Sequence, residues 1–349
     1  ITLRDNAALS ATSAIDVNYA TLQLENSGAS SMSALGDRLK DSAPLTLRGA
    51  AFTLVGRDNA NVVEVVDNMT LAQGMSFFTI TNGGNGIRST ELRIGTLTVQ
   101  NDATLYVTTA NGQMGSNSRM LIGNASGMLV NGVLPFATNA NEFLSYDSQY
   151  GIAALNAVGF RGYDATVVPA TGSATQNLRL ASGSFTISDV GGVGTAGTYT
   201  ANAISFVPSV AGQSLTFADN ADTLNLTSGA FISAANLART IGGTVGNGRL
   251  TVGGTLSSGT ADFYFTQNQS TITLNSAIVD SGYGAKTRLV YSAFNSAVLQ
   301  LTGTNSYTGG TVLNGSPGHT GTIQLANTAA NGTSIVALEP LLLNTNPAS

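Results

Sequence analysis

The sequence contains no cysteine and no tryptophan, and its single histidine is His319. Without thiols, disulfide bonds and thiolate metal sites are excluded. A Ser-His-Asp triad would have to use His319, and no G-x-S-x-G turn is present to carry a nucleophile. His319 lies in "GSPGHTG", where we expect an exposed loop residue. We therefore predict no catalytic site, no metal site and no cofactor, and a chain that is not an enzyme.

Charged residues are also scarce. Asp, Glu, Lys and Arg make up 9% of the chain, where about a quarter is usual, so most of the surface must be neutral. Lysine occurs only at Lys40 and Lys286 and the arginines are scattered, which excludes a basic patch for nucleic acid. A hydrophobic content of 42% with a net charge of -5 argues against disorder.

Long apolar runs are missing as well. The best candidate, "IVALEPLLL" at 335–343, is interrupted by Glu339 and Pro340 and falls short of the roughly 18 residues a membrane helix needs, so we expect no membrane-spanning segment. The chain starts at Ile1 without a basic and apolar leader, so we expect a processed product or a part of a longer chain.

What the sequence does contain is short stretches in which apolar and polar side chains alternate, the period of a β-strand. These stretches are 21–26, 45–49, 52–56, 92–100, 103–109, 184–188, 222–229 and 270–276. Glycine- and asparagine-rich clusters between them supply tight turns. Helix is limited to possible single turns at 33–40 and 232–240. The pattern predicts an all-β fold.

One apolar motif occurs three times, with a leucine followed seven residues later by phenylalanine and a glycine between them. Its core positions are Leu45, Leu47 and Phe52; Leu178, Leu180 and Phe185; and Leu224, Leu226 and Phe231. The starts lie 133 and 46 residues apart, near multiples of a step of about 22 residues, the size of one turn of a parallel β-solenoid.

A solenoid also explains how the chain manages with so few aliphatic side chains per strand, because the turns above and below cover each one. About 16 turns at the inter-strand spacing predict one rod of about 75 Å over residues 1–349. The region 140–175 departs from the rhythm and is rich in tyrosine and phenylalanine. We expect it to be an irregular excursion packed on the rod.

The stretch "LQLTGTNSYTGGTVLNG" at 299–315 resembles the passenger-associated transport repeat, or autotransporter-associated β-strand repeat, of Gram-negative bacteria. The matching residues are Leu299, Leu301, Thr302, Gly303, Asn305, Tyr307, Gly309, Gly310 and Thr311. The repeat unit would extend over 299–332, and the segments 33–56 and 143–155 resemble recurring units of very large secreted proteins built from such repeats.

This resemblance implies a right-handed parallel β-helix carried to the cell surface, near the bacterial outer membrane, usually within a longer chain. Two features of this sequence depart from the family pattern: it does not include the C-terminal membrane barrel, and "NGSPGHTG" at 314–321 is inserted where the motif normally continues straight into its next strand.

Two residue groups suggest other chemistry. Asp219 and Asp222 in "ADNAD" are the best candidates for the paired carboxylates of a polysaccharide-degrading enzyme, although a solvated turn is the simpler interpretation. Tyrosines could form platforms for sugars, or stack along the rod. They are Tyr106, Tyr199, Tyr264, Tyr291 and Tyr307.

Together these observations predict a secreted, extracellular or cell-surface protein that serves as a structural module of a bacterial fibre or surface protein. Self-association into a filament or homo-oligomer is the expected partnership. The alternatives are an adhesin that binds surface glycans and a β-helix enzyme that degrades polysaccharides.

Overall fold

The computed structural model describes residues 1–27, 37–83, 88–139, 141–234, 237–325 and 341–344. Strands account for 50% of the chain and helix for 1%, so the predicted all-β class is confirmed. Within the described residues the one helix is the short 3-10 turn η1 (Ala125–Met128). The turn predicted at 232–240 is instead the end of one strand and the start of the next, and most of the other, at 33–40, lies outside the described residues.

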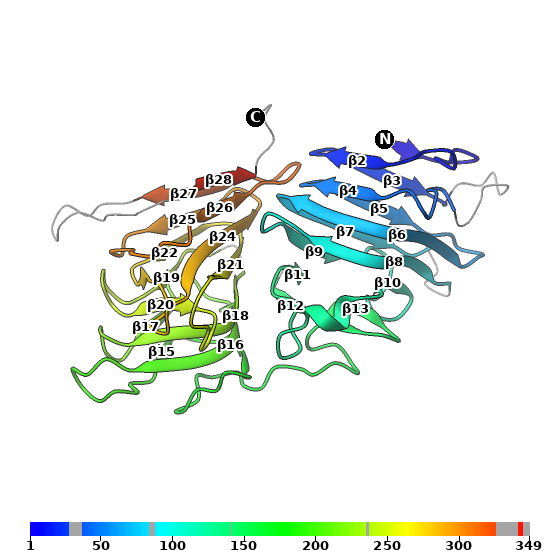
Figure 1. Ribbon diagram of the computed structural model, residues 1–349. Helices are drawn as coiled ribbons and strands as arrows, with labels where there is room; N and C mark the ends of the chain where they lie inside the picture. Colours follow the sequence, from blue (N-terminus) through cyan, green and yellow to red (C-terminus); the bar gives the residue numbers. More distant parts are fainter. Residues whose placement is uncertain (28–36, 84–87, 140, 235–236, 326–340, 345–349) are drawn as a thin grey trace.

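The predicted parallel β-solenoid is also confirmed, with about 11 turns. The coils form two stacks, which we call the N-terminal stack (β1–β13) and the C-terminal stack (β14–β28) (Figure 1). The strands of the N-terminal stack are β1 (Thr2–Leu3), β2 (Ile15–Asn18), β3 (Thr21–Glu25), β4 (Leu45–Arg48), β5 (Ala51–Val55), β6 (Val62–Gln73), β7 (Met75–Thr81), β8 (Thr90–Val99), β9 (Thr104–Thr108), β10 (Ser118–Ile122), β11 (Ala137–Asn139), β12 (Glu142–Asp147) and β13 (Gly151–Ala154).

The C-terminal stack repeats the same construction. Its strands are β14 (Asn177–Leu180), β15 (Phe185–Ile187), β16 (Thr198–Phe206), β17 (Ser214–Phe217), β18 (Thr223–Ser233), β19 (Arg239–Ile241), β20 (Arg249–Val252), β21 (Thr260–Asn268), β22 (Thr271–Leu274), β23 (Ala277–Ile278), β24 (Lys286–Phe294), β25 (Ala297–Leu301), β26 (Thr311–Asn314), β27 (Gly321–Leu325) and β28 (Leu341–Asn344).

Each stack is built from two main sheets of parallel strands. The N-terminal stack has an eight-stranded sheet, ordered β1-β3-β5-β7-β9-β11-β12-β13, and a five-stranded sheet, ordered β10-β8-β6-β4-β2. The C-terminal stack has a nine-stranded sheet along β14-β16-β18-β21-β24-β26-β28, with β20 and β23 beside it, and a six-stranded sheet ordered β15-β17-β19-β22-β25-β27.

The predicted turn length of 22 residues is too short for most coils. Leu289 pairs with Thr311, 22 residues later, whereas Ala230 pairs with Tyr264, 34 residues later. Loops at the corners absorb this variation while the strands keep their register, because only the strands are constrained by the ladder of backbone hydrogen bonds. Because most turns are longer than predicted, the chain forms fewer turns than the predicted 16.

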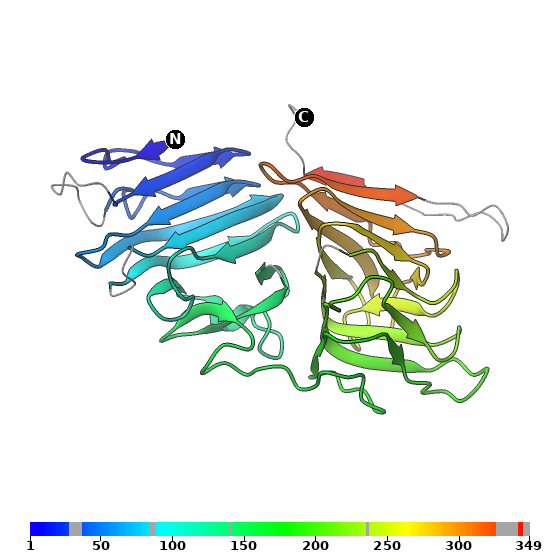
Figure 2. The ribbon, with the colours of Figure 1, turned by 180° about the vertical axis from the view of Figure 1, so that it is seen from behind.

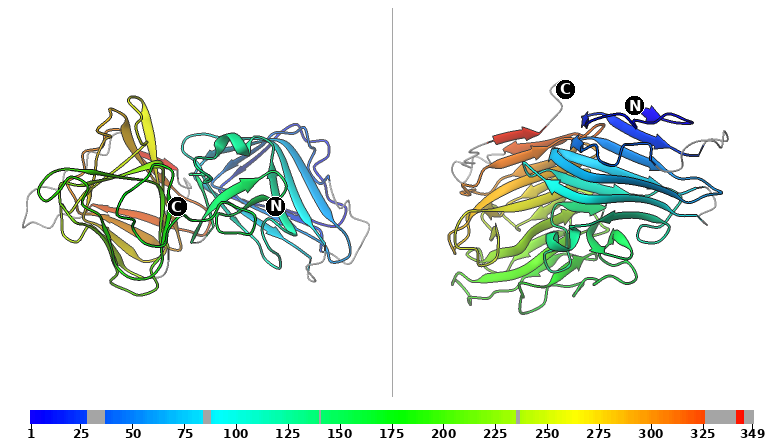
Figure 3. Two further views of the ribbon diagram at one scale, coloured as in Figure 1. Left: turned by 90° about the horizontal axis from the view of Figure 1, so that it is seen from below. Right: turned by 45° about the vertical axis from the view of Figure 1, so that its right-hand side comes forward.

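A single rod was also expected, and the structure differs. The first stack runs in one direction, the chain crosses over, and the second stack runs back beside it, so that β1 and β28 lie at the same end of the molecule (Figures 1 and 2). Viewed along their axes, the two stacks form separate outlines side by side (Figure 3). The intervals between the three Leu-Phe motifs therefore do not count turns along one axis.

The three motifs nevertheless mark real core positions, since all their leucines together with Phe52 and Phe231 are fully or almost fully buried, and Phe185 is half-buried against Phe206. The intervening glycines, Gly49 and Gly183, have φ of +53° and +105° and turn the chain from one sheet to the other. In the third motif Gly229, at φ +72°, instead bends β18 within its own sheet.

The irregular region 140–175 closes the first stack and then leaves it. Strand β12 pairs antiparallel with β11 on one side and with β13 on the other, which ends the parallel ladder of the N-terminal stack. The backbone N–H of Ile122, at the edge of the five-stranded sheet, donates to the Tyr146 hydroxyl at 3.2 Å. The crossing segment (residues 155–176) then carries the chain to the second stack.

Candidate functional site: the junction between the two stacks

The carboxylates predicted as a possible catalytic pair hold loops together. Asp222 is completely buried and its Oδ1 accepts a hydrogen bond of 2.9 Å from the Gly197 N–H of the preceding coil. Asp219 accepts from the N–H groups of Gly194 and Ala221, which lowers its pKa. Burial raises the pKa of Asp222. The predicted solvated turn is thus wrong for Asp222, and both side chains are occupied by backbone donors.

His319 was expected to be an exposed loop residue, and this prediction is wrong. Its ring stacks on Phe77 of the other stack, with centroids 4.6 Å apart and planes inclined by 9°. Phe294 and Tyr106 complete the cluster, with their centroids 4.5 Å apart. Nδ1 of His319 accepts from the Asn295 N–H, and burial lowers the pKa of the imidazole. A neutral aromatic ring is what this environment favours.

The loop that carries His319 is the insertion noted in the sequence. We call residues 315–320, between β26 and β27, the latch loop. The Gly315 carbonyl accepts a 2.9 Å hydrogen bond from the Met75 N–H of the N-terminal stack. A Cβ at Gly49 or Gly74 would lie 2.9 Å from that same carbonyl oxygen, so two corner glycines admit the loop. The inserted loop is therefore one of the contacts that join the two stacks.

A partly buried ion-pair group lies beside the latch loop. Arg288 on β24 reaches Asp102 of the N-terminal stack at 2.6 Å, and its Nε donates to Asp262 on β21 at 2.7 Å. Burial raises the pKa of Asp102 to about 6, with the Asp262 carboxylate adding to the shift and Arg288 opposing it. The Asp102 carbonyl also accepts from the Asn314 side-chain amide at 2.8 Å.

Next to this group, the hydroxyls of Thr104 and Ser292 lie 2.7 Å apart across the junction. Thr104 begins β9 and Ser292 belongs to β24, and both side chains are buried. Two residues 188 positions apart in the sequence thus share a hydrogen bond.

Farther along the junction, towards the crossing segment, the contact is apolar. Val133 and Phe143 of the N-terminal stack and Leu155 at the start of the crossing segment pack on mostly small side chains of β16, β18 and the residue after β18, and the cluster is fully buried. The partners on the C-terminal stack are Ala203, Ala230, Ile232 and Ala234. Short side chains let the two sheets approach closely, so these strands are buried on both faces.

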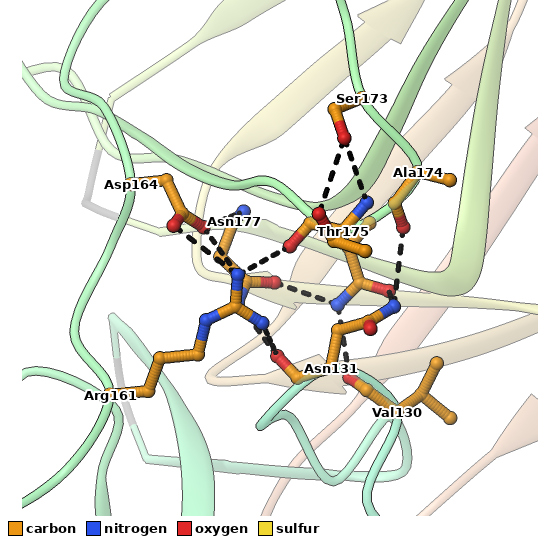
Figure 4. A network of polar contacts seen from close by, with 9 residues as sticks. Val130, Asn131, Arg161, Asp164, Ser173, Ala174, Thr175 and Asn177 are labelled. Atoms are coloured by element: carbon orange, nitrogen blue, oxygen red, sulfur yellow. Dashed lines mark hydrogen bonds and ion pairs between the residues drawn. The ribbon is translucent and has the colours of Figure 1, made fainter.

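An amide network also joins the two stacks near the crossing segment (Figure 4). The Asn202 side chain donates to Asn177 Oδ1 at 2.7 Å and to the Val130 carbonyl at 3.0 Å, and its own Oδ1 accepts from Asn131 at 3.0 Å. Arg161 of the crossing segment donates to the Asn131 carbonyl and is paired with Asp164. Together these bonds link the N-terminal stack, the crossing segment and the C-terminal stack.

The predicted repeat motif at 299–311 has a structural role at each position. Leu299 and Leu301 point into the core. Asn305 Oδ1 accepts from the Ile278 N–H at 2.8 Å, and the buried Tyr307 hydroxyl lies 2.7 Å from Thr311 Oγ1. A Cβ at Gly303 or Gly309 would collide with backbone of the coil below, at 2.5 and 2.4 Å, and Gly310 has φ of +98°.

The tyrosines considered as sugar platforms are used inside the protein. Tyr199, Tyr291 and Tyr307 are fully buried, and burial raises the pKa of Tyr199 and Tyr307 to about 12. Tyr264 packs against the core of the N-terminal stack, and Tyr106 belongs to the aromatic cluster at the latch loop. The interpretation of these residues as packing groups is the better one.

Among the described residues, no three His, Cys, Asp or Glu side chains group in a way that could hold a metal ion. Two shallow clefts of about 270 and 290 Å³ open beside Asp262 and beside Arg93 and Tyr146. No helix in the described part of the chain has the length and apolar character needed to cross a membrane. Comparison of the chain with known protein families, with curated proteins and with solved structures finds no match. The resemblance to passenger-associated repeats therefore stays a prediction.

Proposed function

We propose that the chain is a structural module of a bacterial extracellular fibre or surface protein. The observation that carries this proposal is how the distinctive polar and aromatic groups are used. The paired carboxylates, the lone histidine, the repeat-motif residues and the buried asparagines all hold coil to coil or stack to stack.

A module of this kind gains stiffness from being doubled. A single solenoid is held only by contacts between neighbouring coils, whereas here each stack is also supported along its side by the other. The doubled arrangement makes the module shorter than a single solenoid of the same number of coils, because the second stack runs back beside the first. We infer a short, thick block that resists bending and local unfolding, in place of a long spacer.

The low charge suits the same role. A surface with few lysines and arginines offers few sites for trypsin-like proteases, and parallel coils leave few extended segments free to enter a protease active site. A secreted, cell-surface location of the module follows as part of the proposal.

Labelling of intact cells that produce the protein tests the proposal. Antibodies against the folded chain should decorate extracellular fibres or the cell surface in electron micrographs, and added protease should leave the chain undegraded. Labelling confined to the cell interior, or rapid digestion of the folded chain, would contradict the proposed role.

A further inference from the structure

The four main sheets differ in what their outer faces carry. The five-stranded sheet bears ion pairs, Arg48 with Asp16 and Glu91 with Arg93 and Arg119. The eight- and nine-stranded sheets pack against each other in part at the junction. The six-stranded sheet lies on the side of the C-terminal stack away from the junction (Figure 1).

The outer face of the six-stranded sheet carries no charged side chain. Its six strands contain one charged residue, Arg239, and that guanidinium points into the core, where it is 3% exposed and donates to the carbonyls of Ala234 and Pro208. Soluble proteins usually place lysine or glutamate on such a surface. A neutral outer face on six stacked strands therefore calls for an explanation.

Hydroxyl and amide groups occupy this face in register. Ser214, Thr240, Thr273, Gln300 and Gln324 form one ladder, each residue directly paired with the next. Thr271, Val298 and Thr322 form a second ladder two positions away. Rungs are spaced about 4.8 Å apart along the stack and about 6.6 Å across it. The face thus carries two adjacent ladders of uncharged side chains, all of them polar except Val298.

Some of these side chains are already oriented. Thr273 Oγ1 donates to Gln300 Oε1 at 3.1 Å, and the Thr186 and Thr216 hydroxyls lie 3.1 Å apart. Side chains that hold one another lose less conformational entropy when a ligand binds. Each remains partly exposed, with hydrogen-bonding capacity left for a ligand.

The chemistry of the face selects its ligand. Without cationic side chains it has no means of neutralising phosphate or an acidic polymer, and without an apolar patch it offers nothing to a lipid surface. A regular lattice of hydroxyls and amides matches a ligand that presents uncharged hydroxyls at regular intervals. We propose that the outer face of β17, β19, β22 and β25 binds the surface of a neutral polysaccharide.

Single contacts of this type are weak, about 0.5–1.5 kcal/mol each. Repetition over several coils makes the binding multivalent, so it should be strong towards an insoluble polymer and weak towards a short oligosaccharide. This inference does not depend on the proposed mechanical role.

Sedimentation with microcrystalline cellulose and with insoluble chitin tests the proposal, using the full chain. The protein should be removed from solution by at least one of them. The double variant Thr240→Lys/Thr273→Lys places like charges on adjacent rungs and should bind at least ten-fold more weakly. Thr70→Lys is the matched control, because Thr70 lies on an outward ladder with Thr46 and Thr98 of the N-terminal stack and should leave binding unchanged.

Gln300→Lys provides a second, milder variant, and circular dichroism verifies that each variant is folded. Failure to bind either polymer, or equal binding by folded variants and wild type, would overturn the proposal. So would concentration-dependent oligomers of the wild type that the double variant abolishes without any polysaccharide, since that result would assign the face to a second copy of the chain.

Discussion

The two halves of the junction hold the same pair of stacks by different means. Near the crossing segment, the contact combines an apolar cluster around Phe143 with neutral amides and with the ion pair between Arg179 and Glu142. Near β26 and the latch loop, it consists of a partly buried ion-pair group and an aromatic cluster. The first half depends mainly on burial of apolar area, and the second on charge and on one loop.

This difference has a physical consequence. Apolar contacts and neutral amides do not titrate, so the Phe143 cluster and the Asn202 amides should be insensitive to pH. The half near the latch loop contains a carboxyl group whose pKa lies near 6, so its strength should change within the mildly acidic range. One junction thus combines contacts that do not titrate with a carboxyl group that titrates in the mildly acidic range.

The largest effect should come from the apolar half. Phe143→Ala removes a fully buried ring between the stacks and should cost about 3–5 kcal/mol of unfolding free energy. Phe78→Ala, inside the N-terminal core, should cost a similar amount. Hydrogen exchange distinguishes the two, because only Phe143→Ala should accelerate exchange in β16 and β18. Equal protection of these strands in both variants would show that Phe143 does not hold the stacks together.

The half of the junction near the latch loop should change its contribution to stability in acid. Because the folded state raises the pKa of Asp102 from 3.8 to about 6, it binds the proton more tightly than the unfolded chain does. Stability should therefore increase as the pH falls through 6, by about 2 kcal/mol when the pH reaches 4.

Glu64, whose pKa burial raises to about 7, should contribute in the same direction but outside the junction. Chemical denaturation between pH 8 and 4 measures the sum. Asp102→Asn should flatten the part of the profile between pH 4 and 6, and the exposed Asp16→Asn should not. A profile unchanged by Asp102→Asn would refute the assignment.

The amide network should show coupling between the stacks. Asn202→Ala leaves buried partners unsatisfied and should cost about 1–3 kcal/mol. A double-mutant cycle with Asn131→Ala should give a coupling of about 1 kcal/mol across the junction. Asn225 is the matched control, since it is equally buried and bridges coils within the C-terminal stack, through Gly254. Coupling between Asn225 and Asn131 of the same size would deny the network a specific role.

The smallest effect should come from the latch loop. His319→Ala removes the ring stacked on Phe77 and should cost about 1 kcal/mol, whereas His319→Phe should keep most of that stacking. Thermal denaturation of the two variants compares them. If the phenylalanine variant were no more stable than the alanine variant, ring packing would not be what holds the loop.

The sequence was sufficient to predict the coils of a β-solenoid and insufficient to predict the junction between the two stacks. Alternation and turn glycines predict the parallel β-solenoid, and the Leu-Phe motif identifies Leu45, Leu178 and Leu224 as core residues because their neighbours in the same coil carry the signal. The number and length of the turns were mispredicted because corner loops vary while strands do not.

The strands missed by alternation are informative. In β16, in β24 and in the second part of β18, beyond the predicted stretch 222–229, nearly every position is buried, so the apolar-polar period is lost. Runs of alanine, serine and aliphatic residues, such as "ANAISF" at 201–206, are the signal that could have predicted a second packed face.

The polar contacts of the junction carried no such signal. Asp102 and Arg288 are 186 positions apart, and Asn314 and Asp102 are 212 apart, so each residue alone resembles an ordinary turn or strand residue. His319 looked like a loop residue because its partner, Phe77, lies in the other stack.

All of these predictions require that the two stacks lie side by side. The chain contains no cysteine, so a disulfide between two cysteines introduced at Thr104 and Ser292 can be detected without interference from native thiols. The two hydroxyls are 2.7 Å apart, and the pair should form a disulfide within one chain under mild oxidation, visible as a faster band on a non-reducing gel. A pair at Thr104 and Thr186, on the outer face of the six-stranded sheet, should not. Absence of the intramolecular bond in the folded Thr104/Ser292 variant, or its formation only between chains, would contradict the two-stack arrangement.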